Sequence, residues 1–499
     1  MITFAEACRD PQLFGPWLGA DSWAAWHVLH KALFGEALDA AELATFTELT
    51  GRTEAPTEPA TEAWFVVGRR GGKDVNASAL AAYLATFGAE QLGFLDRLVK
   101  GERGVVQVLA VDRDQAKVCL GYLKAYFEQP LLAQMVAKST ADGLELTNGL
   151  AIEITTNDQR RVRGRTVVAA VFDEVAFWRS ENTVSPDVET YNAVKPAMAT
   201  IPGAMLIGLS SPYARRGLLY NKWKKHYGKP GKVLVVQAPT WRTNPTIARD
   251  GEFLTEAYAD DPASAGAEYG ADFRKDVEQF IALEVVEACI STGIYERAPI
   301  SAVTYFAFVD PSGGSQDSMT LAISHAEGGE DDRLVVLDAI REVKPPFSPE
   351  GCVAEFCDVL RLYGVTRVHG DRYAGEWPRE QFRKHGIEYE VAEKVRSDLY
   401  RDCLPVLNSG RVALLDSQRL VNQFVGLERK VARGGRESID HGPGSHDDIA
   451  NAIAGAIGLA SQPIQNAGWW FMGDDGAIYL DGRDSRQPTP RTVQRSYIP

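Results

Sequence analysis

The sequence lacks several features that mark specialised classes of protein. No apolar run reaches the roughly 18 residues that a membrane-spanning helix needs, so we do not expect an integral membrane protein. The N-terminal residues contain no basic stretch followed by an apolar core, which argues against a secretory signal peptide. The six cysteines are scattered without a CxxC pair, so neither a zinc site nor a disulfide framework is expected. These absences fit a protein of a reducing cytosol.

Positive charge is also in short supply. Together the lysines and arginines number 53, against 67 acidic residues, and the net charge is −14. That balance excludes a protein that is basic over its whole surface, although a local basic patch is enough to hold a phosphate backbone. With 45% hydrophobic and 24% charged residues, the composition is that of a globular protein. A length of 499 residues is too great for one ordinary core and predicts two or more domains.

Two blocks of alternating strand-like and helix-like segments organise the chain. Residues 1–60 have helical spacing, and residues 61–240 alternate in the way typical of a parallel sheet with crossover helices. Residues 241–300 are mostly helical in pattern and are predicted to form a linker or subdomain. A second alternating block spans 301–464 and predicts a mixed sheet, so the expected fold class is α/β throughout. The tail, 465–499, is rich in Gly, Asp, Arg and Pro and is expected to be mobile.

A glycine-rich segment lies between the first predicted strand and a predicted helix, the setting that a phosphate-binding loop needs. It consists of Gly68, Arg69, Arg70, Gly71, Gly72 and Lys73. Glycines let backbone N–H groups close around phosphate oxygens, and Lys73 would reach the β- and γ-phosphates of ATP. Two residues depart from the usual pattern, since Val67 stands at the first glycine and Asp74 replaces a hydroxyl. Taken alone, the segment is equally compatible with a basic turn.

An acidic pair follows a later apolar run. Val167–Phe172 has the pattern of a buried parallel strand, and Asp173 and Glu174 come directly after it. In an ATPase, Asp173 would hold Mg²⁺ through water and Glu174 would polarise the attacking water. A strand that ends in a solvated acidic turn is the alternative. Arg163, ten residues before Asp173, would stabilise charge on the γ-phosphate or belong to a basic surface loop.

Acidic residues recur at strand ends in the second block. Asp310 closes one predicted strand, Asp317 opens the next, and Asp371 ends a later one. Asp447 and Asp448 begin a late helix, whose phase favours Asp448 as the ligand, although both are retained. The predicted order of elements is that of a ribonuclease-H-like nuclease fold: three strands, a helix, a strand and a late helix that carries acids. Crowded carboxylates favour two Mg²⁺ or Mn²⁺ ions that activate water and stabilise a leaving oxygen. Each acid alone is more often a turn or cap residue.

A basic turn precedes this late helix. It contains Arg429, Lys430, Arg433 and Arg436 around two glycines. Such a turn beside a nuclease site would hold a DNA backbone without reading its sequence. A solvated charged hairpin is an alternative of equal weight.

In the order of these motifs the chain resembles the large terminase subunit of tailed bacteriophages, the DNA-packaging motor. The resemblance covers about residues 60–460 and rests on GRRGGKD, VRG, VFDE, VDPSGG, GDRYAGEW and SHDDIANAIA. It includes Ser210, Ser211 and Pro212, a tripeptide position that couples hydrolysis to movement in that family. The resemblance implies an N-terminal P-loop ATPase domain of the ASCE type, a C-terminal RNase-H-like nuclease domain, and a trigger or finger role for Arg163.

The function implied by the resemblance is ATP-driven packaging of double-stranded viral DNA, with metal-dependent cleavage of concatemeric DNA. The implied cofactors are ATP with Mg²⁺ at the first site and two Mg²⁺ or Mn²⁺ ions at the second. The implied partners are double-stranded DNA, a portal protein, a small terminase subunit and further copies of this chain in a ring, expected to be a pentamer. The expected location is the host cytoplasm, with transient docking on the procapsid.

Two other functions stay open on the sequence. An ATP-dependent helicase or repair nuclease needs strand-separation motifs and a second motor domain, which the second half does not resemble. A structural protein that docks on DNA or on the portal with a silent ATP site is favoured by one residue, Asp74. Unwinding of forked DNA would reveal the first alternative, and ATP hydrolysis with and without DNA would test the second.

Overall fold

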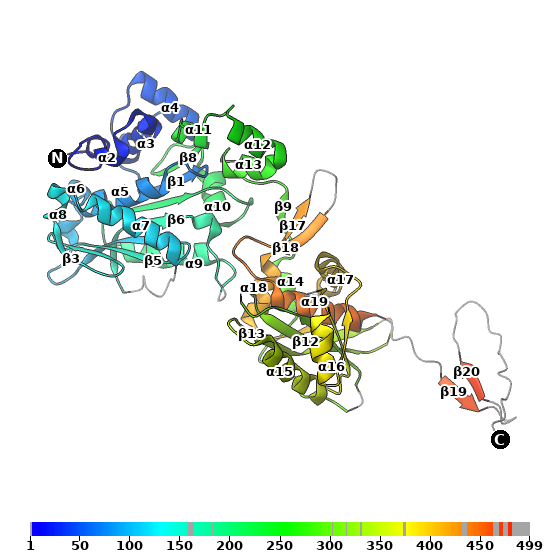
Figure 1. Cartoon of the computed structure of the whole chain (residues 1–499). Helices are drawn as coiled ribbons and strands as arrows, with labels where there is room; N and C mark the ends of the chain where they lie inside the picture. Colours follow the sequence, from blue (N-terminus) through cyan, green and yellow to red (C-terminus); the bar gives the residue numbers. More distant parts are fainter. Residues whose placement is uncertain are drawn as a thin grey trace. The chain divides into compact units, whose positions relative to one another are not determined.

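The computed structural model divides into two compact units (Figure 1). The first contains Met1–Glu287 and Ser417–Asp447, and the second contains Ala288–Asp416 and Asp448–Pro499. The sequence predicts one domain over 301–464, whereas the structure assigns Ser417–Asp447 to the first unit. The structure describes residues 2–157, 164–180, 183–301, 303–315, 317–329, 332–372, 376–431, 437–462, 469–472 and 478–481.

An eight-stranded sheet forms the centre of the first unit. Its strand order is β3-β4-β5-β2-β6-β7-β1-β8, in which the six strands from β5 onward run parallel and the β3–β4 hairpin joins antiparallel. The strands are β1 (Glu62–Val67), β2 (Gly104–Ala110), β3 (Val136–Ser139), β4 (Gly143–Leu146), β5 (Ala151–Thr156), β6 (Thr166–Asp173), β7 (Met205–Ser210) and β8 (Val233–Ala238).

Helices cover both faces of this sheet. The α-helices of the first unit up to residue 287 are α1 (Phe4–Ala7), α2 (Gly15–Leu18), α3 (Ala24–Phe34), α4 (Ala40–Thr50), α5 (Lys73–Ala85), α6 (Phe87–Gln91), α7 (Arg113–Tyr126), α8 (Pro130–Ala133), α9 (Pro186–Met198), α10 (Gly217–His226), α11 (Thr240–Thr243), α12 (Glu252–Asp260) and α13 (Pro262–Glu268). A further helix, α14 (Leu283–Ala288), ends at the boundary between the units.

Alternate residues of β1 reach the two faces. Phe65 belongs to a core cluster with α3, α5 and α7, and its ring centre lies 5.6 Å from that of Trp26. Trp64 belongs to a second cluster with α9 and α10, and its ring centre lies 6.4 Å from that of Phe172. Every residue of β1, β2 and β7 is buried, as is typical of parallel strands covered on both sides.

Strand β7 lies between β1 and β6. The register pairs Val66 of β1 with Ser210 at the end of β7, and Asp173 at the end of β6 with Leu209. Because parallel strands end at the same edge, the loop after β1, the acidic turn after β6 and the segment after β7 meet there. An extra strand between the phosphate-loop strand and the strand of the acidic pair is the ASCE arrangement, so the predicted class of this domain is confirmed.

The segment Ser417–Asp447 completes the first unit with a helix and a hairpin. Its β17 also pairs with β9, which gives a three-stranded sheet in the order β18-β17-β9. Glu428 on β17 is fully buried, where Tyr213 donates to it over 2.6 Å and Arg216 forms an ion pair with it. These partners compensate the buried charge. The elements are α18 (Gln418–Gly426), β17 (Leu427–Val431), β18 (Glu437–His441) and β9 (Val277–Gln279).

The second unit is built on a seven-stranded mixed sheet. Its order is β10-β16-β13-β12-β11-β14-β15. Strand β12 is antiparallel to both of its neighbours, β11 and β13, and β14 is parallel to β11. This is the RNase-H-like order that the sequence predicts. The strands are β10 (Ile290–Ser291), β11 (Tyr305–Asp310), β12 (Met319–Glu327), β13 (Leu334–Val343), β14 (Arg367–Gly370), β15 (Glu388–Val391) and β16 (Val412–Leu415). The helices are α15 (Pro349–Leu362), α16 (Trp377–Lys384), α17 (Arg396–Asn408) and α19 (Asp448–Ser461).

Two helices sandwich the middle of this sheet. Ala307 and Val309 of β11 share a core cluster with α15, whereas Phe308 lies against α19 on the other face. Gly455 of α19 makes that contact possible, because a Cβ atom there would lie 2.3 Å from the Phe308 ring. Asp310 follows Phe308 by two residues and therefore lies on the α19 face as well.

Three further observations concern the whole chain. None of the described helices combines the length and the apolar character that crossing a membrane requires. All six cysteines are buried and free. Within the predicted tail, the structure describes one antiparallel hairpin, formed by β19 (Trp469–Met472) and β20 (Ile478–Asp481).

Candidate active sites

The glycine-rich loop joins β1 to the N-terminus of α5. Arg70 and Gly72 have positive φ angles of 64° and 83°, and a Cβ atom at Gly72 would lie 2.4 Å from the Trp23 ring. Helix α5 begins at Lys73 without a side-chain cap, so the backbone N–H groups of its first turn remain available at the loop. A loop of this shape at a helix N-terminus favours an anion such as a phosphate.

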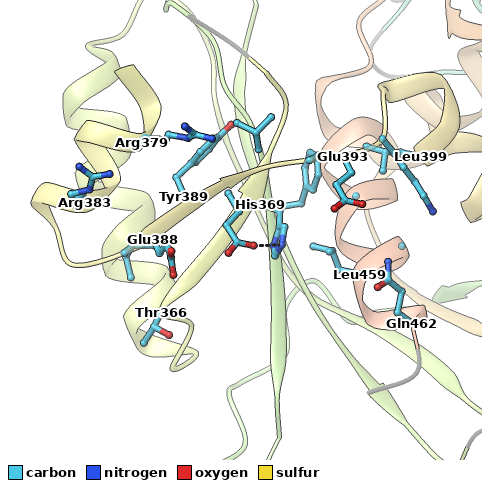
Figure 2. A pocket seen from close by; sticks show the side chains of 18 of the residues that line it. Thr366, His369, Arg379, Arg383, Glu388, Tyr389, Glu393, Leu399, Leu459 and Gln462 are labelled. Atoms are coloured by element: carbon cyan, nitrogen blue, oxygen red, sulfur yellow. Dashed lines mark ion pairs between the residues drawn. The ribbon is translucent and has the colours of Figure 1, made fainter. Parts of the chain in front are cut away.

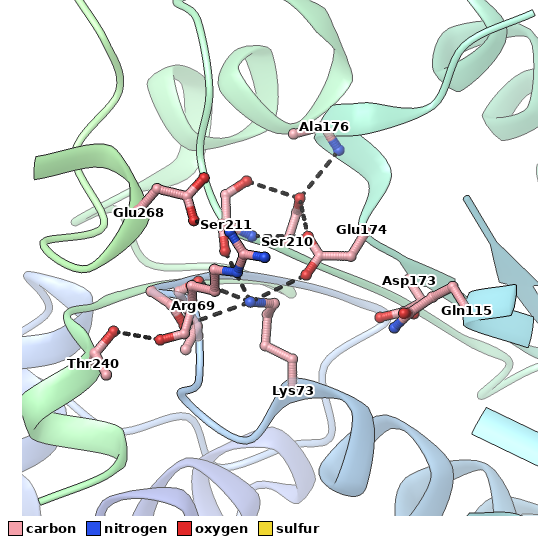
Figure 3. Close-up of polar contacts among 12 residues, drawn as sticks. Arg69, Lys73, Gln115, Asp173, Glu174, Ala176, Ser210, Ser211, Thr240 and Glu268 are labelled. Atoms are coloured by element: carbon pink, nitrogen blue, oxygen red, sulfur yellow. Dashed lines mark hydrogen bonds and ion pairs between the residues drawn. The ribbon is translucent and has the colours of Figure 1, made fainter. Parts of the chain in front are cut away.

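Lys73 connects the loop to the two neighbouring strand ends (Figure 3). Its buried ammonium donates to the Ser211 hydroxyl over 2.9 Å and lies 3.2 Å from a Glu174 carboxylate oxygen. The other Glu174 oxygen accepts from the Ser210 hydroxyl at 3.0 Å and from the Ser211 N–H at 3.2 Å. Glu174 has a φ angle of 49°, a strained conformation of the kind that gathers at functional sites. The structure thus brings together Lys73, Glu174, Ser210 and Ser211.

Asp173 is fully buried at the same edge. Its Oδ2 atom accepts from Gln115 at 2.9 Å and lies 3.7 Å from the Cys119 thiol, and both partners belong to α7. Its Oδ1 atom has no hydrogen-bond partner among the described residues. Burial, together with the charges of Glu174 and Asp74, raises the pKa of Asp173 to about 7. Burial also raises the pKa of the neighbouring Asp74. An arrangement of this kind suits a cation, because a cation relieves repulsion between carboxylates.

Other residues of the predicted site lie at its rim. The Arg69 guanidinium is exposed and forms an ion pair with Glu268 at 3.3 Å, while its carbonyl accepts from Thr240 at 2.8 Å. The Arg70 carbonyl accepts from Asn244 at 2.9 Å. Pro212 follows the two serines on the segment after β7. Arg163 lies outside the described residues.

Sequence reasoning missed several residues that support this loop. Gln115, Thr240 and Asn244 all contact it or its acids, and Trp26 donates to the Gly71 carbonyl over 2.8 Å. Asn244 stands in an Asn-Pro pair that the sequence marks only as part of a linker. No local pattern connects these side chains with a loop far away in the sequence.

In the second unit, Asp310 and Asp371 stand at neighbouring strand ends. Val309 of β11 pairs with Gly370 of β14, so the two aspartates follow adjacent paired positions. The buried Asn451 amide of α19 donates to Asp371 over 2.7 Å. Asp448 begins the same helix, where its carboxylate accepts from the Ser318 N–H at 3.3 Å.

The charges of Asp371 and Asp448 both act on Asp310. Burial raises the pKa of Asp310 well above its ordinary value, and the charges of Asp371 and Asp448 raise it further. A hydrogen bond from Asn451 opposes the shift. The Oδ1 atom of Asn451 is buried without a partner among the described residues. The set of Asp310, Asp371 and Asp448 therefore has the charge and the oxygen donors that a divalent cation requires.

Asp317 and Asp447 are two further predicted ligands, with different surroundings. Asp317 is exposed, and its carbonyl accepts from the Ser312 hydroxyl at 2.6 Å. Asp447 belongs to the first unit, where its carboxylate lies near Asp440 and His441, with ligand atoms within 4.8 Å of one another. The sequence expected both acids of the late helix in one site. The structure begins the helix at Asp448, so only that residue belongs to the unit that holds Asp310 and Asp371.

The predicted basic turn also belongs to the first unit. Arg429 and Lys430 lie on β17, where the Arg429 guanidinium is 5.9 Å from the centre of the Phe280 ring and 3.9 Å from Glu437. Arg433 and Arg436 lie outside the described residues. The sequence places this turn in the nuclease domain. The structure instead assigns β17 to the first unit, where it pairs with β9.

A cavity of about 1040 Å³ in the second unit lies beside β15, the last strand of the sheet (Figure 2). His369 and Glu390 form an ion pair within it at 3.0 Å, and Gly455 and Leu459 of α19 contribute to its wall. Charges of both signs line it, and none of the three crowded aspartates does. The cavity and the three aspartates are therefore separate features of this unit.

Comparisons with known proteins return solved structures of one family. No family model and no curated protein matches the chain. The chain matches bacteriophage large terminases. The HK97 bacteriophage large terminase has 17% identity and a TM-score of 0.35, and the match covers 81% of this chain and 91% of that one.

Two matches concern single domains. The ATPase domain of the Thermus phage P74-26 large terminase has 17% identity and a TM-score of 0.33, over 49% of this chain and 97% of that one. The large terminase nuclease of the thermophilic phage G20c, with bound magnesium, has 16% identity and a TM-score of 0.30, over 35% and 95%. At such identities the likeness concerns the fold, and the role of each residue rests on the contacts of this chain.

Proposed function

We propose that this chain is an ATP-driven motor that packages double-stranded viral DNA and cuts concatemeric DNA with a metal-dependent endonuclease. One observation carries the proposal. Lys73, Asp173 and Glu174 converge at one edge of an ASCE-type sheet, while the same chain holds Asp310, Asp371 and Asp448 on an RNase-H-like sheet. One chain would then hold a site for nucleotide hydrolysis and a site for phosphodiester cleavage, as expected of a motor that also cuts the DNA it moves.

The residues of the first site fit ATP with a divalent cation. Asp173 offers a buried oxygen without a partner, and the loop offers the N-terminus of α5. Mg²⁺ would neutralise charge on the phosphates. Lys73 would bind the β- and γ-phosphates, which requires its ammonium to leave Glu174. Glu174 would orient and polarise the attacking water.

Ser210 and Ser211 support a coupling role. Both contact Glu174, and Ser211 also contacts Lys73. A change in the position of Glu174 or Lys73 on hydrolysis would therefore act directly on the end of β7 and on Pro212 after it. Arg163 is proposed to act on the γ-phosphate of a neighbouring subunit in a ring, the pentamer that the resemblance implies.

The residues of the second site fit one or two Mg²⁺ or Mn²⁺ ions. The charges of Asp371 and Asp448 act on Asp310, and the buried Oδ1 atom of Asn451 has no hydrogen-bond partner among the described residues. The metal would supply an activated water and stabilise the leaving oxygen. Asn451 holds Asp371 in position, and the Ser318 N–H does the same for Asp448. Asp317 is proposed as a rim residue, and Asp447 as a ligand outside this core set.

The partners follow from the proposed activity. Double-stranded DNA is the cargo and the substrate of cleavage, and Arg429, Lys430, Arg433 and Arg436 are proposed to contact its backbone. A portal protein and a small terminase subunit complete the proposed machine, on a procapsid in the host cytoplasm.

A double measurement on the full chain tests the proposal. We expect ATP hydrolysis that Glu174→Ala abolishes and plasmid cleavage that Asp310→Asn abolishes, each without loss of the other activity. Forked DNA should not be unwound, which separates the motor from a helicase. Asp74 is the specific observation in favour of a structural protein with a silent ATP site, and an absence of ATP hydrolysis with and without DNA would support that alternative.

A further inference from the structure

The carboxylate of Asp173 is oriented by one helix. Gln115 and Cys119 stand one turn apart on α7, and both contact its Oδ2 atom, at 2.9 and 3.7 Å. The other oxygen, Oδ1, has no hydrogen-bond partner among the described residues, although the side chain is fully buried. An unpaired buried carboxylate oxygen is unfavourable unless something else binds there. The two contacts therefore fix the carboxylate through Oδ2 and leave Oδ1 open to a ligand.

Asp74 adds a second carboxylate at this point. It occupies the second position of α5, directly after Lys73, and is partly buried. The Gln115 amide donates to Asp173 over 2.9 Å, and it also acts to lower the pKa of Asp74, so one amide influences both acids. In most phosphate loops the residue after the lysine is Ser or Thr, which offers a neutral hydroxyl to the metal. This chain offers a full negative charge in that place.

Asp74 and Asp173 form no ion pair within 4.0 Å among the described residues, although the charge of Lys73 acts on both of them. Lys73 pairs with Glu174 at 3.2 Å. Within the described part of the chain, no Lys, Arg or His nitrogen lies within 4.0 Å of a carboxylate oxygen of Asp74 or Asp173. Asp74 and Asp173 repel one another at this edge, and Oδ1 of Asp173 is buried without a hydrogen-bond partner among the described residues, so a divalent cation bound between them would relieve the repulsion and use the open oxygen.

We propose that Asp74 and Asp173 form a divalent-cation site that is occupied before nucleotide binds and in its absence. The cation class is a hard ion with oxygen ligands, Mg²⁺ or Mn²⁺. With a hydroxyl at position 74, the cation would depend on phosphate oxygens for most of its charge balance and would arrive with the nucleotide. With two carboxylates, the cation binds first and makes the loop attractive to phosphate. The identity of the loop as an ATP site rests on the proposed function, but cation binding does not.

Binding of Mn²⁺ to the full chain without nucleotide tests this inference. Asp310→Asn, Asp371→Asn and Asp447→Asn form the background, because they remove the other acidic clusters described above. Free Mn²⁺ is followed by electron paramagnetic resonance, and we expect one Mn²⁺ per chain. Loss of an outer-sphere partner typically weakens metal binding by about 10- to 100-fold, so Asp74→Ser, which removes a ligand, should weaken it by at least about tenfold.

Two further variants make the test specific. Asp74→Asn keeps the shape of the side chain and should weaken Mn²⁺ binding as Asp74→Ser does. Asp114→Ser removes an equal charge from the same region, but Asp114 is exposed and pairs with Lys117, so it should leave Mn²⁺ binding unchanged. Circular dichroism melting in EDTA verifies that each variant is folded.

Failure of the inference and failure of the proposed function give different results. Absence of Mn²⁺ binding in the background protein, or unchanged binding in Asp74→Ser, overturns the inference even if the wild-type chain hydrolyses ATP. Mn²⁺ binding that depends on Asp74 supports the inference even if no ATP is hydrolysed, in which case only the proposed function fails.

Discussion

The two candidate sites hold their acids in different ways. In the first unit, Glu174 has an ion pair with Lys73 and hydrogen bonds from Ser210 and Ser211. In the second, Asp371 receives an amide hydrogen bond from Asn451, and the charge of Arg396 acts to lower the pKa of Asp310.

The difference indicates two kinds of ligand. A site that combines a lysine, a helix N-terminus and carboxylates is prepared for an anion together with a cation, as MgATP is. A site of carboxylates that accept hydrogen bonds from an amide and a backbone N–H has the oxygen donors that cations need, and its anionic substrate would depend on those cations. Each prediction below separates the two sites or links them.

The largest expected effect is on turnover at the first site. Glu174→Gln removes the group that polarises water and should lower kcat for ATP hydrolysis by about 10²- to 10⁴-fold, the usual contribution of a general base. Nucleotide binding should persist, because Lys73 and the loop remain. Steady-state hydrolysis and equilibrium binding of a fluorescent ATP analogue check this. The exposed Glu256 provides the control Glu256→Gln, and near-normal turnover in Glu174→Gln would show that another residue is the base.

The next effect belongs to the second site alone. Asp371→Asn should lower plasmid cleavage by about 100-fold or more in Mg²⁺ or Mn²⁺, since it removes a metal ligand. Cleavage should fail in Ca²⁺, whose looser coordination supports in-line displacement poorly. ATP hydrolysis should not change. Asp358→Asn, at an exposed residue of α15 that pairs with Arg361, is the control. Equal loss of ATPase activity in Asp371→Asn would mean that the two sites are not separate.

A smaller effect is expected where strand β7 meets Glu174. Ser210→Ala removes one hydrogen bond to the glutamate and one to the Ala176 N–H. A hydrogen bond to a charged group contributes about 1.5–3 kcal/mol, and part of it persists through the Ser211 N–H, so kcat should fall by about tenfold. The KM for ATP should change little. A rise in the KM for ATP with unchanged kcat would instead assign Ser210 to nucleotide binding.

The smallest predicted effect contrasts the stability of the two units with pH. His325 of the second unit is buried against Asp338 at 2.7 Å, and this hydrogen bond raises its pKa. Its contribution to stability is therefore complete below the ordinary pKa and is lost as the pH rises through the raised value. His30 of the first unit is buried with its pKa lowered to about 3, so it costs stability as the pH falls below about 6.5.

Thermal unfolding of the full chain at pH 6 and pH 8 tests this contrast. The transition of the second unit should gain stability at pH 6 relative to that of the first. His325→Gln should remove that gain and leave the first transition unchanged. An identical pH response in the variant and the wild type would exclude His325 as the cause.

The sequence predicts the elements that carry strong local patterns. Gly104–Ala110 is apolar except for Gln107 and forms β2 within those bounds, and the alternation of strands and helices is enough for both fold classes. The loop, the acidic pair and the strand-end aspartates were found because each follows an apolar run directly. Val233–Ala238 carries a signal of the same type, yet it was not included among the predicted strands.

Other features have no local signal. Gln115 and Asn451 orient acids of the two sites from helices that are distant in sequence, and an amide on a helix resembles any surface residue. The membership of Ser417–Asp447 in the first unit depends on the pairing of β17 with β9 and on the burial of Glu428, which only the folded chain reveals. The same holds for the separation of Asp447 from Asp448.

The path of the chain between the units has a practical consequence for dissection of this protein. The chain leaves the first unit after Glu287, returns at Ser417 and leaves again after Asp447, so no single cut separates the units. A fragment that begins near residue 288 would carry Glu428 without Tyr213 and Arg216 and would expose the edge of β17 that β9 covers. Such a fragment is expected to aggregate through that edge. Replacement of residues 417–447 by a short flexible linker is the better route to an isolated second unit.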